Sequence, residues 1–372
     1  MTLPSHFLVF FFGLLALRAA EVSSFGRKTV KALLKTCDDP GVPKNGFRVG
    51  EDFDYKAKVE YFCNPGFRLT AGTRLRQCQQ NKKWSGTLPT CEEKTKVSPH
   101  TCGTLGNSKN ATRIRRIVGG ISSDYGAWPW QVAISYNSTR RKSYLFNGAL
   151  IKPGWVLTVA NVLQVKKGVT PIKPNRLQVI LGEFNRNKLD GTETPVTVKR
   201  IVLHPGYDRT TMAHNIALLE LEKPVRLNDH IRMVCVPKRK RDKILEKPLQ
   251  FGTVAGWGST KAIRLGEPTG PLSAELRQVT VPIVPDKECK EASIYSFDKE
   301  TTLCAGFKKK PKDPCFGDVG SPLVMQQPRS GRWIVIGLFG WSEGCGRPRK
   351  YAYYTRVSKY RKWINFIVRS RQ

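Results

Sequence analysis

Acidic residues are scarce in this chain. Its 372 residues include 29 aspartates and glutamates against 63 lysines and arginines, which gives a formal net charge of +34. Such an excess says little about the fold, but it predicts polyanionic partners such as glycans, acidic lipids or nucleic acid. Aromatic side chains are not interleaved with the basic runs, so a stacking platform for single-stranded nucleic acid is not expected.

Beyond its N-terminus the sequence lacks any apolar run long enough to cross a bilayer. The one long run, Phe7–Leu17, is too short for a span and has the length of a signal-peptide core. We expect a signal peptide over residues 1–24, cleaved between Ala19 and Ser24. The protein is therefore predicted to be secreted, or stored in secretory granules before release, which also argues against a nucleic-acid partner.

The ten cysteines are even in number. In a secreted chain this predicts disulfides rather than metal thiolates, so no metal and no cofactor are expected. Two glycosylation sequons, at Asn110 and Asn137, fit the same compartment. Four cysteines lie between Cys37 and Cys91, among short aromatic and β-branched runs separated by turn residues. That spacing predicts a small β module that needs covalent staples, and it leaves three pairings open.

Residues 37–91 resemble a sushi (complement-control) module. The matching residues are Asn45-Gly46, Tyr61-Phe62-Cys63, Gly66-Phe67 and Trp84-Ser85. The resemblance implies the bridges Cys37–Cys78 and Cys63–Cys91.

A polar linker is expected over residues 92–116, and it ends in a basic cluster at Arg116, immediately before Ile117. Exposed clusters of this kind are cut by trypsin-like enzymes, so we predict cleavage between these two residues. The alternative is a solvated run of charge.

From residue 117 to 372, alternating strands separated by turns predict an all-β barrel architecture. Only the C-terminus is expected to be helical, because Tyr360, Trp363, Ile364 and Ile367 recur at helical spacing. Ser358 is placed to cap that helix.

Ordered motifs across residues 117–372 resemble the chymotrypsin-like serine proteases, including inactive members of the horseshoe-crab haemocyte type. In chain order they read RIVGG, WPWQV, WVLTVANVL, HNIALLEL, VCVP, VAGWG, LCAGF, GDVGSPLV, GLFGWSEGCG and YYTRV. The resemblance implies an all-β fold: a chymotrypsin-like double β-barrel with a C-terminal helix, plus the small disulfide-stapled sushi module. It also implies the bridges Cys102–Cys235, Cys289–Cys304 and Cys315–Cys345.

Alignment with this family puts its catalytic histidine, aspartate and serine at Asn161, Asn215 and Val319. The reaction needs a hydroxyl nucleophile, an imidazole base and a carboxylate that orients the imidazole. Two amides and an isopropyl group supply none of these, so we predict a serine protease homologue that is not an enzyme. The neighbours His214 and Ser321 are interpreted as packing residues.

The surroundings of these positions keep several features that the resemblance implies. Gly317 and Val319 supply the N–H groups of an oxyanion hole. Asp318 is placed to pair with the new Ile117 ammonium after cleavage at Arg116.

A specificity pocket is also implied, but its walls depart from the family pattern. Asp313 stands where trypsin-like members select Arg or Lys. Ser342 and Ala352 replace glycines, which puts a working pocket in doubt.

Basic clusters recur at residues 237–243, 307–312 and 346–350 and along the last helix. We expect an anion-binding surface where the first cluster meets that helix. Its predicted residues are Lys238, Arg239, Lys240, Arg241, Arg361, Lys362, Arg369 and Arg371. Four sushi residues, Arg74, Arg76, Lys82 and Lys83, are expected to contribute less.

The sequence therefore predicts a pseudoprotease that binds lipopolysaccharide or sulfated glycans, with peripheral contact to anionic membranes. Azurocidin, a basic and inactive family member, is the precedent for an antimicrobial role. One alternative is a non-catalytic cofactor that binds an active protease of a clotting or immune cascade. Another is a carrier like haptoglobin, which also joins sushi modules to an inactive protease domain.

Overall fold

The computed structural model describes residues 36–64, 67–93, 101–106, 121–137, 142–164, 172–238, 242, 245–262, 270–309 and 313–369. Several predicted features lie outside these residues. They are the signal peptide, the Asn110 sequon, the cleavage pair Arg116 and Ile117, and the cations Arg239, Lys240, Arg241 and Arg371. Within the described part, no helix is long and apolar enough to span a membrane.

The N-terminal module is built from two small antiparallel sheets. One has the strand order β1-β2-β4 and the other pairs β3 with β5. The strands are β1 (Gly46–Val49), β2 (Lys58–Cys63), β3 (Phe67–Ala71), β4 (Leu75–Gln77) and β5 (Thr90–Glu93). Disulfides join Cys37 to Cys78 and Cys63 to Cys91, as the resemblance implies.

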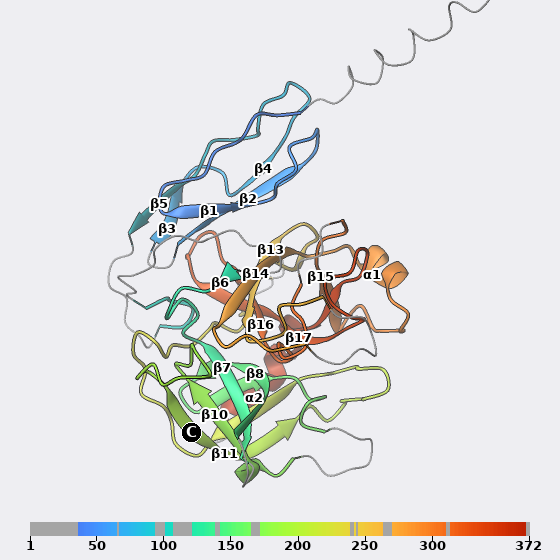
Figure 1. Ribbon diagram of the computed structural model, residues 1–372. Coiled ribbons are helices and arrows are strands. Elements are labelled where there is room, and N and C mark those ends of the chain that lie inside the picture. Colours follow the sequence, from blue (N-terminus) through green and yellow to red (C-terminus); the bar gives the residue numbers. More distant parts are fainter. Residues whose placement is uncertain are drawn as a thin grey trace, which may run out of the picture.

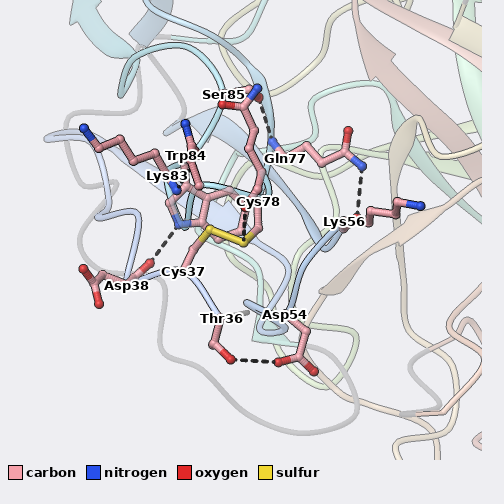
Figure 2. Close-up of a disulfide and its surroundings, with 12 residues drawn as sticks. Thr36, Cys37, Asp38, Asp54, Lys56, Gln77, Cys78, Lys83, Trp84 and Ser85 are labelled. Atoms are coloured by element: carbon pink, nitrogen blue, oxygen red, sulfur yellow. Dashed lines mark hydrogen bonds between the residues drawn. A yellow bond between two sulfur atoms is a disulfide. The ribbon is translucent and has the colours of Figure 1, made fainter. Parts of the chain in front are cut away.

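The surroundings of the first of these disulfides show how so small a module keeps its shape (Figure 2). The Trp84 indole N–H donates to the Asp38 carbonyl at 2.8 Å, and the Gln77 amide N–H donates to the Ser85 hydroxyl at 2.8 Å. The Thr36 hydroxyl donates to the Asp54 carboxylate at 3.2 Å. These bonds tie the loops to the strands where apolar burial alone is small.

The rest of the described chain forms two β units (Figure 1). A closed barrel has the strand order β10-β11-β12-β9-β8-β7. Its strands are β7 (Gln131–Asn137), β8 (Lys142–Lys152), β9 (Trp155–Thr158), β10 (Leu177–Leu181), β11 (Thr194–Leu203) and β12 (Ala217–Leu221), with a 3₁₀ turn η1 at Pro174–Arg176. Apolar residues at alternate strand positions fill its interior, among them Val132, Leu150 and Val179.

The second unit is a seven-stranded sheet with the order β15-β18-β17-β16-β13-β14-β6. Its strands are β6 (Ile121–Ser122), β13 (Phe251–Gly256), β14 (Arg277–Pro282), β15 (Thr302–Ala305), β16 (Pro322–Gln326), β17 (Trp333–Ser342) and β18 (Ala352–Arg356). The all-β architecture predicted for this region is therefore confirmed.

The helical predictions need two corrections. A short helix α1 (Asp286–Ala292) precedes β15 and was not expected, because Cys289 is its only buried residue and gives no periodic apolar signal. The C-terminal helix is present as α2 (Arg361–Arg369), but a 3₁₀ turn η3 (Val357–Tyr360) precedes it. Ser358 lies inside that turn and does not cap the helix; its hydroxyl is buried without a partner among the described residues.

The sushi module packs against the start of β13 and the end of β16 in the seven-stranded sheet, next to a buried ion pair. Glu60 of β2 accepts a hydrogen bond from the Phe251 N–H at 2.9 Å and pairs with Arg74 at 2.7 Å. Arg74 also donates to the Gln326 carbonyl at 2.5 Å, and its guanidinium lies over the Phe62 ring. In Figure 1 the module (blue) lies next to this sheet, on the side opposite the closed barrel.

Candidate functional site

The structure brings Asn161 and Asn215 together at one end of the closed barrel. Asn161 follows β9 and Asn215 precedes β12, and these strands pair in antiparallel register. The Asn215 side-chain oxygen accepts hydrogen bonds from the N–H groups of Ala160 at 2.9 Å and Asn161 at 2.8 Å. The Asn161 amide donates to the Gly340 carbonyl at 3.0 Å. The two amides thus link the closed barrel to β17 of the second unit.

Val319 lies in the turn before β16, at the junction of the two β units. Its carbonyl accepts a hydrogen bond from the Asn147 N–H at 2.8 Å, and the Asn147 side chain donates to the Gly317 carbonyl at 2.7 Å. The next residue, Gly320, sits so close to Thr158 that an added Cβ would lie 2.7 Å from the threonine hydroxyl. This closeness places the turn beside the end of β9, three residues before Asn161.

Two polar side chains, Ser321 and His214, lie close to these positions in the sequence. Ser321 is fully buried, and its hydroxyl accepts a hydrogen bond from Gln131 at 3.3 Å. The His214 Nδ1 lies 3.1 Å from the Tyr360 hydroxyl, and its ring stacks on His204 with centroids 4.8 Å apart. Both side chains therefore serve in packing contacts, as interpreted from the sequence.

Asp318 and Asp313 line one pocket, together with residues of β13 and β14. The Asp318 carboxylate accepts hydrogen bonds from the N–H groups of Gly258 at 2.7 Å and Cys315 at 2.9 Å. Burial raises the pKa of Asp318 to about 6, although these bonds act to lower it. Burial likewise raises the pKa of Asp313 to about 7, against one weak bond from the Gly346 N–H.

The expected pocket walls face each other across two strands. Ser342 at the end of β17 pairs with Ala352 at the start of β18, and Ala352 is fully buried. Glu343, the next residue, is buried and forms an ion pair with Lys350 at 2.6 Å. Trp341 precedes Ser342, and its ring stacks on Tyr353 at 3.9 Å.

Sequence reasoning missed three residues of this region. Gly340, Trp341 and Glu343 lie within the motif GLFGWSEGCG. Gly340 has no side chain and acts through its carbonyl, so only a structure reveals its contact with Asn161. The acidic residue in a basic neighbourhood was the available signal for Glu343.

The three remaining disulfides also follow the pairing that the resemblance implies. They are Cys102–Cys235, Cys289–Cys304 and Cys315–Cys345. No free cysteine remains among the described residues.

The structure brings the start of the first basic cluster to helix α2. The Arg361 guanidinium donates to the Lys238 carbonyl. The base of this loop is held by Asp242, whose buried carboxylate accepts hydrogen bonds from the Lys238 N–H at 2.9 Å and the Gln327 amide at 2.8 Å. Lys362 and Arg369 point outward from the helix. We call Lys238, Arg361, Lys362 and Arg369 the basic face.

Several cations of the other clusters are already used within the fold. Lys350 pairs with Glu343, and Lys308 pairs with Glu288 at 3.0 Å. In the sushi module, Arg74 is buried in the contact with the sheet, and Arg76 donates to the carbonyls of Ser85 and Pro40. Only Lys82 and Lys83 of the four sushi residues are exposed.

One acidic group could hold a hard cation. Oxygen atoms of Glu183, Asp190 and Glu193 lie within 4.8 Å of one another, and oxygen ligands of this kind suit calcium. Some of these oxygen atoms already hold the loop together, because the Glu193 carboxylate accepts hydrogen bonds from the N–H groups of Asp190 and Gly191.

Two regions of the chain match known protein families. Residues 117–364 match the family model for trypsin. The chain belongs to the trypsin family. Residues 37–91 match the model for the sushi repeat, also called the SCR repeat. These two domain types and the five disulfides fit an extracellular protein.

Two curated relatives combine similarity over most of this chain with much greater length. Mannan-binding lectin serine protease 1 of Mus musculus is 29% identical over 84% of this chain and 44% of its own length. Limulus clotting factor C of Carcinoscorpius rotundicauda is 26% identical over 94% of this chain and 33% of its own length. This trypsin-family chain thus spans less than half of either relative.

Proposed function

We propose that this protein is a non-catalytic serine protease homologue of innate defence that binds polyanionic surfaces, such as lipopolysaccharide or sulfated glycans. The observation that carries the proposal is the basic face, in which Arg361 of α2 contacts Lys238 of the adjoining loop.

The loss of catalysis is supported by the chemistry at the three aligned positions. Asn161 and Asn215 are bound to backbone groups and have no proton to exchange near neutral pH. Val319 carries no nucleophile. Loss of the nucleophile alone lowers kcat by about six orders of magnitude in a related protease. A fluorophosphonate probe should therefore leave the protein unlabelled, before and after cleavage at Arg116. Stoichiometric labelling would refute this part of the proposal.

Anion binding is supported by the way charge is distributed. Many cations elsewhere are neutralised by partners such as Glu343 and Glu288, whereas Lys362 and Arg369 have no ion pair with any described residue. Exposed guanidinium groups grip phosphate or sulfate oxygens in pairs, and lysines add point charge. Binding should weaken steeply with salt, because such charges are screened within about 8 Å at physiological ionic strength.

The test is chromatography on immobilised heparin and on immobilised lipopolysaccharide with a salt gradient. Lys238→Ser with Lys240→Ser removes two charges of the first basic cluster, and Lys82→Ser with Lys83→Ser removes two from the sushi module. The first variant should elute at clearly lower salt than the second, with unfolding temperatures unchanged. Earlier elution of the sushi variant alone would assign recognition to the small module.

A second candidate is a non-catalytic cofactor of a protease cascade, which the two serine-protease relatives favour. In this form, cleavage after Arg116 would let the Ile117 ammonium pair with Asp318, whose carboxylate lines the pocket at β13. The cleaved protein should then change the turnover of a serine protease from the same fluid, and the Asp318→Asn variant should not. Equal effects of cleaved and uncleaved protein would argue against this role.

A further inference from the structure

Helix α2 carries one large apolar side chain on its outer face. Phe366 is 70% exposed. The opposite face of the helix packs on the protein: Tyr360 and Ile364 are buried in the core, and Trp363 and Ile367 pack against it. The exposure of Phe366 therefore contributes nothing to the fold.

The neighbours of Phe366 on that face are cationic. Lys362 lies four residues before it and Arg369 three residues after it, which places all three on one side of a helix. All three are exposed. A single exposed apolar residue is ordinary on a protein surface. Here the ring is flanked on its own helical face by two cations that form no ion pair with the described residues.

We propose that this face of α2 docks on a layer of phosphate-bearing anionic lipids, with the Phe366 ring entering the acyl boundary. The inference rests on the proposed anion binding and restricts the binding partner to anionic lipids. Lys362 and Arg369 would contact phosphate headgroups, as cations of amphipathic interfacial helices do, while the apolar ring enters the region just beneath them. A sulfated glycan offers the charges but no apolar layer, so it would leave Phe366 in water.

The charge of the surrounding surface favours the same orientation. Lys238 lies beside the start of the helix, because its carbonyl accepts a hydrogen bond from Arg361. Cations near a membrane surface are drawn to anionic lipids and much less to neutral ones. The proposed layer is therefore anionic, and phosphatidylcholine alone should not bind.

The experiment compares vesicle binding with heparin binding on the same variants. Vesicles of phosphatidylcholine with phosphatidylglycerol, and of phosphatidylcholine alone, are sedimented with the full-length protein. Phe366→Ser should weaken binding to the anionic vesicles about ten- to a hundredfold, since burying a phenylalanine ring contributes about 1.5–3 kcal/mol. Phe366→Trp should retain binding. Leu189→Ser, at a position 90% exposed on a different loop, is the matched control and should bind as the wild type does.

Heparin separates this inference from the proposed function. Phe366→Ser should elute from heparin as the wild type does, whereas Lys362→Ser with Arg369→Ser should lose affinity for both ligands. If Phe366→Ser keeps full vesicle affinity, the lipid docking is wrong while heparin binding stands. If the wild type binds neither ligand, the proposed function fails as well. A loss of self-association in Phe366→Ser, with unchanged vesicle binding, would assign the face to a second copy and overturn the proposal.

Discussion

Asn215, the residue that we predict to stand at the family's catalytic carboxylate position, makes structural hydrogen bonds. Its side-chain oxygen serves two backbone N–H groups of the segment after β9. Its amide nitrogen is buried without a partner among the described residues. An aspartate side chain would keep an acceptor for both N–H groups.

These contacts make a stability prediction. Asn215→Ala should lower the free energy of unfolding by about 1–3 kcal/mol, because two buried donors lose their acceptor. Asn215→Asp is the matched control and should cost little. Both are measured by denaturant unfolding. Equal losses in the two variants would show that the side-chain oxygen is not what matters.

Asp318 gives the folded protein a pH dependence. Its folded pKa of about 6 lies above the ordinary value of 3.8, so the folded state holds the proton more tightly. The stabilisation is complete below the unfolded pKa and is lost as pH rises through about 6, with a size of about 2–3 kcal/mol.

The uncleaved protein should therefore lose stability between about pH 4 and about pH 7, and Asp318→Asn should lose less. Cleavage after Arg116 should reverse the trend if the Ile117 ammonium reaches the carboxylate. Thermal unfolding of both forms across this range measures it. A variant that follows the wild-type curve would contradict the assignment.

At the scale of elements, the position of the loop that begins at Lys238, beside α2, depends on one acidic residue within a basic run. Asp242 is buried and holds the Lys238 N–H and the Gln327 side chain. Asp242→Asn keeps the carbonyl acceptor for Lys238, whereas Asp242→Ala removes it.

We expect Asp242→Ala to lower heparin affinity although it removes a negative charge. Added positive charge alone would raise affinity, so a decrease would report the loss of loop position. Asp242→Asn should bind at least as well as the wild type. Salt-gradient elution measures both, and an increase in both variants would mean that loop position does not matter.

How far the sequence predicts each element depends on where its signal lies. The strands and α2 were predictable, because their apolar residues alternate or recur at helical spacing and are buried as expected. Helix α1 was not, since five of its seven residues are charged and only Cys289 is buried. The 3₁₀ turn before α2 was not predicted, because a serine such as Ser358 is equally compatible with a helix cap and with a turn.

The candidate site follows the same division. The family motifs predict Asn161, Asn215 and Val319 as the triad positions, and the structure joins the first two by a direct hydrogen bond. Contacts made through backbone groups, such as those of Gly340 and Gly317, leave no mark in the sequence. Nor do ion pairs between distant residues, which is why the engagement of Arg74 and Lys350 was not foreseen.

At the scale of the whole molecule, Glu60 couples the sushi module to the second β unit. Burial raises its pKa from 4.5 to about 7 despite the attraction of Arg74. The docked state therefore binds the proton more tightly than an undocked state, in which Glu60 would be hydrated. Docking is favoured at low pH, and this contribution is lost as pH rises through about 7.

The Phe251 amide, which donates to Glu60, should accordingly be less protected from hydrogen exchange at about pH 8 than at about pH 6, after correction for the intrinsic exchange rate. Glu60→Gln retains an acceptor and cannot ionise, so its protection should not vary with pH. Unchanged protection in the wild type would rule out this coupling.

The Cys102–Cys235 bridge joins the segment after the sushi module to the chain beyond β12. A cut after Arg116 would therefore break the peptide chain without separating the products. The lysines at Lys82 and Lys83 and the outer face of α2 would stay within one particle. For a ligand that repeats its charges along a polymer or across a surface, the second contact then forms at a high effective concentration. A cut alone therefore leaves the particle bivalent, and reduction alone leaves the chain continuous; only both together can yield two monovalent pieces.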